Sequence, residues 1–175
     1  VIIGIIASIT IPAIINDTKE KEMVTQAKKA YSTFLNVLNR MKADQGSLDY
    51  GGIFTTSLSR DEKVQEIAKY YSGATVCTAP SEICGTYYSI KMANGENDGS
   101  PLSFPRILLS DGSLLYFWIV GTSCEPYSSA GQTFTRCATV IFDVNGEGKG
   151  PNQYGADLHQ LIVNKDGITI PEGNY

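Results

Sequence analysis

The chain has 175 residues, of which 42% are hydrophobic and 18% charged, and its formal net charge is −4. This length and composition predict one compact domain with room for a projecting element, and not a disordered chain. The charge is negative and Lys and Arg form no cluster, which argues against a dedicated nucleic-acid binder.

The first fifteen residues, Val1 to Ile15, carry no charge and are mostly Ile, Val and Ala. The run is shorter than the roughly 20 residues of a membrane-spanning helix, and it lacks the positive start and polar cleavage site of a signal peptide. We expect it to be part of a longer apolar helix or to pack against other copies of itself. Pro12 lacks an N–H and its ring would clash with the carbonyl of Ser8, so a kink or break is expected there.

From Asn16 to Gln45 the chain is rich in Lys, Glu, Ala and Gln, which are good helix formers. Apolar residues recur there at steps of three and four, at Val24, Ala27, Tyr31, Phe34, Leu38 and Met41. This spacing predicts one face of a helix that ends near Gly46. We expect the globular part of the chain after Gly46, called the head below, to cover this stripe. Joined to the apolar run, the helix has about 45 residues and is about 68 Å long at 1.5 Å per residue.

The rest of the chain reads as a small head. Ser59 and Glu62 form the pattern of a capping box, which predicts a short helix up to Gly73. Strands are predicted at 86–92, 107–109, 114–120, 139–144, 158–163 and 168–170, with hairpin turns at Asp111-Gly112 and at 164–167. Hairpin connections imply an antiparallel sheet. The predicted fold class is α+β, with residues 1–15 as the apolar half of the helix, 16–46 as its amphipathic half and 47–175 as the head.

The four cysteines are Cys77, Cys84, Cys124 and Cys137. An even number suggests two disulfides, and four cysteines allow three connectivities. The spacings do not match the C-x2-C pairs of a zinc site. We predict the pairs Cys77–Cys84 and Cys124–Cys137, because each closes a short local loop. Disulfides indicate an oxidising compartment.

Both ends of the chain are similar to one protein family. Gly4, Ala7, Thr10, Pro12 and Ala13, set among Ile and Val, are followed by the amphipathic stretch that contains 28–32. Near the C-terminus come Phe142-Asp143-Val144-Asn145-Gly146, then Gly150-Pro151-Asn152 and Gly155-Ala156-Asp157. This combination resembles type IV pilins and the pseudopilins of type II secretion.

The resemblance implies a structural subunit of an extracellular filament, or fimbrium, held together by bundled N-terminal helices. The residues it places in the filament core are Ile2, Gly4, Ile5, Ile6, Ile9, Pro12 and Ile14, with the helix unwinding near Pro12. It implies an inner-membrane protein before assembly, with the assembly machinery and other copies of itself as partners. The family's processing site, its N-methylated Phe and a Glu precede this segment, so we expect about ten further residues before Val1.

Other functions stay open on the sequence. The same fold serves pseudopilins of secretion or DNA-uptake machines, and the head could also be a membrane-tethered, monomeric binding module. Trp118 and the tyrosine pairs at 70–71 and 87–88 could form an adhesive face for cell adhesion, although such residues more often pack in a core. We do not expect an enzyme, since His159 is the only histidine and no nucleophile or phosphate-loop motif is present.

The C-terminal segment also contains a candidate calcium site. Asp143, Asn145 and Glu147 follow the spacing that opens an EF-hand loop, but the twelfth position is Tyr154, which cannot supply the bidentate carboxylate. Asn152 or Asp157 could complete an oxygen cage for Ca²⁺, as the calcium dependence of some pseudopilins implies. The alternative is a turn built by Asn and Asp side chains without an ion.

Overall fold

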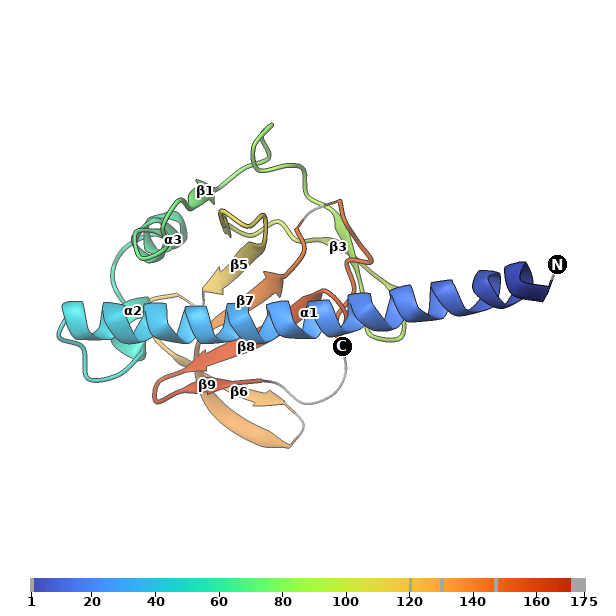
Figure 1. Ribbon diagram of the computed structural model, residues 1–175. Coiled ribbons are helices and arrows are strands. Elements are labelled where there is room, and N and C mark those ends of the chain that lie inside the picture. Colours follow the sequence, from blue (N-terminus) through green and yellow to red (C-terminus); the bar gives the residue numbers. More distant parts are fainter. Residues whose placement is uncertain (1, 120, 130, 147, 171–175) are drawn as a thin grey trace.

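The computed structural model describes residues 2–119, 121–129, 131–146 and 148–170, with side chains described at 18–98, 102–118, 121–128, 131, 133–146 and 148–170. Figure 1 shows one long helix, α1, lying across a twisted sheet and extending past it at its N-terminal end. The chain is therefore an α+β protein with a helix packed on an antiparallel sheet.

Helix α1 spans Ile2–Asp44 and ends as the sequence predicts. Gly46 has a positive φ of 63°, its N–H donates to the carbonyl of Ala43, and the N–H of Ser47 donates to that of Lys42. This pair of bonds satisfies carbonyls of the last turn, as in a Schellman motif. The expected break at Pro12 is absent here, since α1 is helical through this position. Unwinding within a filament stays a prediction.

Two short helices follow. Helix α2 spans Gly51–Phe54, which the sequence did not predict, and α3 spans Arg60–Ala68. The capping box at α3 is confirmed: the Ser59 hydroxyl accepts from the N–H of Glu62, and the Glu62 carboxylate accepts from the N–H of Ser59. The head therefore begins with helical turns at the carboxyl end of α1 (Figure 1).

The main sheet is antiparallel, with strands in the order β1 (Thr75–Cys77), β4 (Arg106–Leu108), β5 (Leu114–Ile119), β7 (Gln132–Asp143), β8 (Leu158–Asn164) and β9 (Ile168–Thr169). Strand β6 (Glu125–Ser129) pairs with the first part of β7, and β2 (Ser89–Lys91) pairs separately with β3 (Asn97–Pro101). The predicted strand at 86–92 is thus mostly wrong, because only its last part pairs. The sequence missed β1, β3 and β6, as well as the first half of β7.

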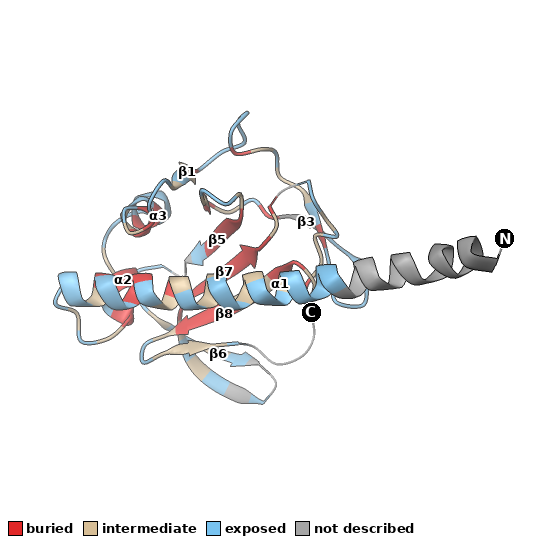
Figure 2. Cartoon of the chain, viewed as in Figure 1, coloured by how far each residue is buried: buried red, intermediate tan, exposed pale blue. Residues whose placement is uncertain are grey.

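One face of the sheet packs against α1. Phe34 lies edge-on to Phe117 and Phe142, and Leu38 and Met41 are buried beside it. The predicted stripe is wrong at Val24, which is 52% exposed, whereas Val37 is only 4% exposed. Ala27 and Tyr31 are partly covered. The buried face of α1 therefore includes Val37 and leaves out Val24. Figure 2 shows much of the outward side of α1 in pale blue, the colour of exposed residues.

The opposite face carries a second, smaller core. Leu114, Tyr116 and Ile141 of the sheet are covered there by Ile90, Leu102 and Tyr154. These covering residues come from β2, from the segment after β3 and from the turn before β8. Irregular chain therefore closes this face where the sequence offered no periodic pattern.

Candidate functional site

The acidic turn predicted near the C-terminus lies where β7 ends. Asp143 is fully buried. One of its carboxylate oxygens accepts from the N–H groups of Asn145 (3.3 Å) and Gly146 (2.8 Å), and the other accepts from the Tyr88 hydroxyl at 2.5 Å. Tyr88 thereby joins the irregular segment of the second core to the end of β7.

Asp157, also fully buried, forms the second half of this turn. Its Oδ2 accepts from the N–H of Asn152 (2.8 Å) and from the Asn145 side-chain amide (3.3 Å), and its Oδ1 accepts from the N–H of Gln153 (2.8 Å). The structure thus brings together Asp143, Asn145, Asn152 and Asp157, as the sequence analysis expected. Glu147 lies outside the described residues.

Hydrogen bonds already occupy all four carboxylate oxygens of this turn. Two buried acceptors, the Oδ1 atoms of Asn145 and Asn152, have no hydrogen-bond partner among the described atoms. Two amide oxygens fall short of the six to eight oxygen ligands that Ca²⁺ takes, so an ion would have to displace donors from Asp143 or Asp157. No cluster of three His, Cys, Asp or Glu side chains suited to a metal occurs among the described residues. Asp143 and Asp157 thus hold the turn by hydrogen bonds from main-chain N–H groups, and a bound Ca²⁺ stays a prediction.

Burial sets the protonation behaviour of this region. Burial raises the pKa of Asp143 above its ordinary value, the nearby Asp157 adds to the rise, and hydrogen bonds from Tyr88 and Gly146 oppose it. Burial, and then the Asp143 charge, raise the pKa of Tyr88. Burial lowers the pKa of His159, whose Nε2 lies 3.1 Å from the carbonyl oxygen of Ala156. His159 therefore faces a main-chain carbonyl.

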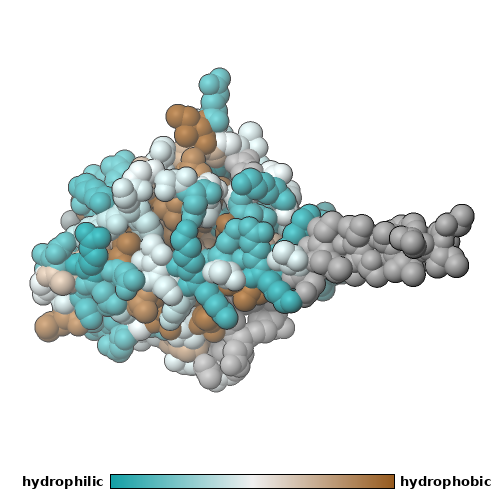
Figure 3. Space-filling model, in the orientation of Figure 1, coloured by the Kyte–Doolittle hydropathy of each residue, from teal (hydrophilic) through white to brown (hydrophobic). Residues whose placement is uncertain are grey.

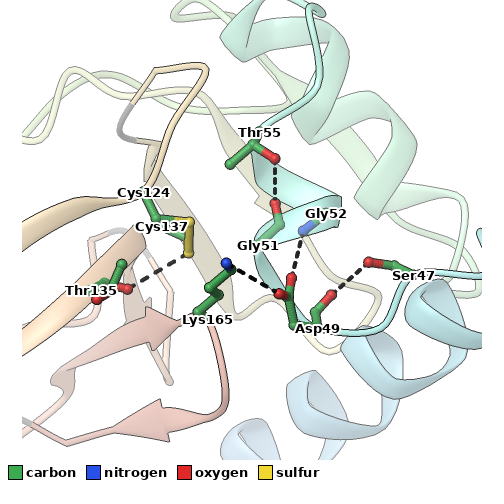
Figure 4. A network of polar contacts seen from close by, with 9 residues as sticks. All are labelled: Ser47, Asp49, Gly51, Gly52, Thr55, Cys124, Thr135, Cys137 and Lys165. Carbon is green, nitrogen blue, oxygen red and sulfur yellow. Dashed lines mark hydrogen bonds and ion pairs between the residues drawn. A yellow bond between two sulfur atoms is a disulfide. The ribbon is translucent and has the colours of Figure 1, made fainter.

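Both predicted disulfides are present, Cys77–Cys84 and Cys124–Cys137. The first closes a loop whose carbonyls at Cys84 and Gly85 accept from the buried guanidinium of Arg106. The second lies beside the chain that follows α1 (Figure 4). Each disulfide therefore fixes a loop at the border of the head.

A polar network holds the loop 46–49 that follows α1. Figure 4 shows Asp49 at its centre: its carboxylate accepts from the N–H of Gly52 (3.1 Å) and lies 3.8 Å from the Lys165 Nζ. The Ser47 hydroxyl donates to the carbonyl of Asp49, and the N–H of Tyr50 donates to that of Lys165. No sequence pattern predicts the partner Lys165, which comes from the turn between β8 and β9.

The candidate aromatic face is largely engaged within the protein. Trp118 is 44% exposed, but it stacks on Phe104 at 5.7 Å between ring centroids, and the guanidinium of Arg136 lies 5.3 Å over the same ring. Tyr71 is buried, and Tyr88 is bound to Asp143. The Phe104 ring and the Arg136 guanidinium both contact Trp118 across the plane of its ring, where a ligand would stack. This arrangement favours a packing role.

A groove of about 540 Å³ runs between α1 and β8. Its walls are mostly apolar, with Ala27, Tyr31 and Ser32 on the helix side and Leu158 and Leu161 on the strand side. Lys28 and His159 also line it, and no Asp or Glu does so among its described residues. The sequence analysis missed this α1–β8 groove, because it depends on how far the helix stands from β8.

The residues assigned to the filament core, from Ile2 to Ile14, lie before the first described side chain. Where side chains are described, no helix is long and apolar enough to cross a membrane. Comparisons with family models, curated proteins and solved structures each gave no match.

Proposed function

We propose that this chain is a structural subunit of a pilin-like filament, in which the apolar run 1–15 of neighbouring copies forms the core and the heads form the surface. The filament would lie outside the cell, after assembly from the inner membrane. In this role the protein binds copies of itself and performs no catalysis.

The observation that carries the proposal is the division of α1. Among its described side chains, which start at Thr18, the first that packs against the main core is Met23, and Thr18 to Glu22 are exposed. The helix nevertheless starts at Ile2, about 30 Å earlier at 1.5 Å per residue. The described part of α1 thus packs on the head from Met23 onward, while the sequence of residues 1–15 carries no charge.

An uncharged run of this length favours burial. Each Å² of apolar surface removed from water contributes about 25 cal/mol, and the helical backbone satisfies its own polar groups in a dry core. Packing of the runs from several copies supplies such burial without any change in the heads. The two disulfides are in keeping with an oxidising compartment.

Electron microscopy and sedimentation of the full chain test the proposal. We expect filaments from the wild type and only monomers from Ile6→Asp, because a charge is not cheaply buried in a dry bundle. Ile83→Asp is the matched control, since Ile83 is 71% exposed on the first disulfide loop and should leave filaments intact. A chain lacking residues 1–15 should also be monomeric.

Two results would overturn the proposal. Filaments formed by Ile6→Asp as readily as by the wild type would place the contacts elsewhere. A wild type that stays monomeric at all concentrations would favour the tethered binding module.

A further inference from the structure

One lysine of the head is buried without an acidic partner among the described residues. Lys63 of α3 is 4% exposed, and its Nζ donates to the carbonyl oxygen of Gly121 at 2.9 Å. The ion pairs between described side chains involve other lysines. Lysine is rarely buried unless an opposite charge accompanies it. The Lys63 amine therefore lacks the partner that its burial calls for.

Lys63 lines a pocket of about 350 Å³ between the start of α3 and the chain that joins β5 to β6. Arg60 lies on the α3 side of this Lys63 pocket, and Gly121 and Thr122 lie on the other side. Both partners of the Lys63–Gly121 hydrogen bond line the pocket, so this bond lies at its wall. An ammonium group has three N–H donors, and Gly121 accepts from one of them. The other two can serve a ligand.

The electrostatics of the amine favour an anion as that ligand. Burial lowers the pKa of Lys63 below its ordinary value of 10.5, and no described acid opposes this lowering. Glu125 also lines the pocket, but it is exposed, so solvent screens its charge from the amine. The ammonium form is therefore destabilised in the free protein, and an anion bound beside it offsets that loss.

The surface of the head also favours a small ligand. The face in Figure 3 is mostly hydrophilic, with apolar colour in separate small patches among the coloured residues. Small patches of this kind do not mark a broad protein interface. A pocket, in contrast, binds a small molecule through a few polar groups and some apolar wall. Leu58 and Trp118, which are 37% and 44% exposed, supply apolar wall in the Lys63 pocket.

We propose that the Lys63 pocket binds a small organic monocarboxylate, whose carboxylate accepts hydrogen bonds from the Lys63 ammonium and the Arg60 guanidinium. The apolar part of the ligand lies against Leu58 and Trp118, and Trp118 keeps its contacts with Phe104 and Arg136. This ligand site belongs to the head and does not depend on filament assembly.

The charges that line the pocket favour one negative charge on the ligand and not two. Arg60 and Lys63 are positive and Glu125 is negative, so two positive charges and one negative charge leave a net charge of +1 on the described lining. A monocarboxylate balances this charge, whereas a phosphate dianion leaves one negative charge unbalanced near Glu125. A carboxylate also matches the planar donor fork of the exposed Arg60.

Isothermal titration calorimetry of the full chain with sodium benzoate, at constant ionic strength, tests the site. We expect the wild type to bind benzoate and Lys63→Met to bind it about tenfold more weakly or worse, because this change removes the charge and keeps an unbranched side chain. Lys69→Met is the matched control, since Lys69 is exposed on the same helix, pairs with Glu66 and does not line the pocket. Its affinity for benzoate should equal that of the wild type.

A second variant tests the site without any change in the buried part of the head. Arg60→Gln, at an exposed position, should weaken benzoate binding by about threefold, because solvent screens the contribution of an exposed charge. Two further probes test the charge of the ligand. Benzamide has the shape of benzoate without its charge, and both benzamide and inorganic phosphate should bind the wild type more weakly than benzoate.

Any of three results would overturn the inference. The first is a wild type that does not bind benzoate at millimolar concentrations. The second is an affinity for benzoate that stays unchanged in Lys63→Met or Arg60→Gln, or that falls in Lys69→Met as far as in Lys63→Met. The third is binding of benzamide or phosphate as tight as that of benzoate.

Discussion

The two faces of the main sheet are closed in different ways. On one face a single helix contributes Phe34, Val37, Leu38 and Met41 to one continuous core. On the other face, short and irregular segments cover Leu114, Tyr116 and Ile141. The helical face has large apolar side chains at its centre, whereas the irregular face also contains the buried Tyr88–Asp143 hydrogen bond.

This difference separates two sources of stability. The stability of the helical face depends mainly on filled volume, since Phe34, Val37, Leu38 and Met41 are buried among other apolar side chains. The stability of the irregular face depends also on hydrogen-bond geometry, because a buried carboxylate is tolerated only while its donors stay in place. Removal of volume should therefore do most damage on the first face, and removal of one donor on the second.

The largest effect is expected from Phe34→Ala. The ring is fully buried, with its centroid 5.5 Å from that of Phe142, so its loss leaves a cavity beneath α1. We expect unfolding free energy to fall by about 3–5 kcal/mol, measured by urea denaturation. Phe134→Ala, on the partly exposed β6–β7 hairpin, is the control and should cost less. Equal losses in both variants would contradict the central place of Phe34.

A smaller effect is expected from Tyr88→Phe on the irregular face. The change removes the donor to Asp143 and keeps the ring, so one buried oxygen loses a partner. The expected loss is about 1–3 kcal/mol, and it should be greater at neutral pH, where Asp143 is more ionised. Tyr87→Phe is the matched control, because no hydroxyl contact of Tyr87 supports the second core, and it should stay within about 0.5 kcal/mol.

The pH dependence of Asp143 gives a third test. The pKa of Asp143 is raised above its ordinary value of 3.8, so over the range between the two pKa values the folded chain keeps a proton that the unfolded chain has released. The carboxyl therefore supports folding most when protonated, and its contribution declines as pH rises from 3.8 through the raised pKa. Unfolding free energy of the wild type minus that of Asp143→Asn should fall over this range.

Asp98→Asn, at an exposed site, is the control for that measurement and should give a flat difference. A wild-type advantage over Asp143→Asn that instead grows with pH would mean that the three donors to Asp143 outweigh its burial. The roles of burial and hydrogen bonding at this carboxyl would then be reversed.

The same comparison of the two faces explains which parts of the fold the sequence could predict. The end of α1 at Gly46 and the cap formed by Ser59 and Glu62 were predictable because each signal lies within a few residues. Strand β3 was not, since its sequence Asn-Asp-Gly-Ser-Pro disfavours a strand and it forms by pairing with β2. Local chemistry thus predicted the helical side well and the irregular side poorly.

The candidate site shows the same limit. The sequence predicted that Asp143, Asn145 and Asp157 belong to one polar turn, because Asn and Asp favour turns. It did not predict Tyr88, which reaches Asp143 from 55 residues away in the chain. The α1–β8 groove was also missed, since its width is set by tertiary packing and not by any residue pattern.

The smallest expected effect concerns the position where the helix prediction was wrong. Steps of three and four fit a line through Val24 as well as one through its neighbours, so periodicity alone fixes the buried face of α1 only approximately. The structure leaves Val24 half exposed and buries Val37.

Val24→Ala should change unfolding free energy by at most about 0.5 kcal/mol, partly offset by the better helix propensity of Ala. Val37→Ala is the same substitution at a buried position of α1. It should lower unfolding free energy by about 1.6 kcal/mol, from two buried carbons at about 0.8 kcal/mol each. Urea denaturation of both variants decides between the two lines, because a greater loss from Val24→Ala than from Val37→Ala would mean that α1 lies on the sheet along the line that the sequence predicted.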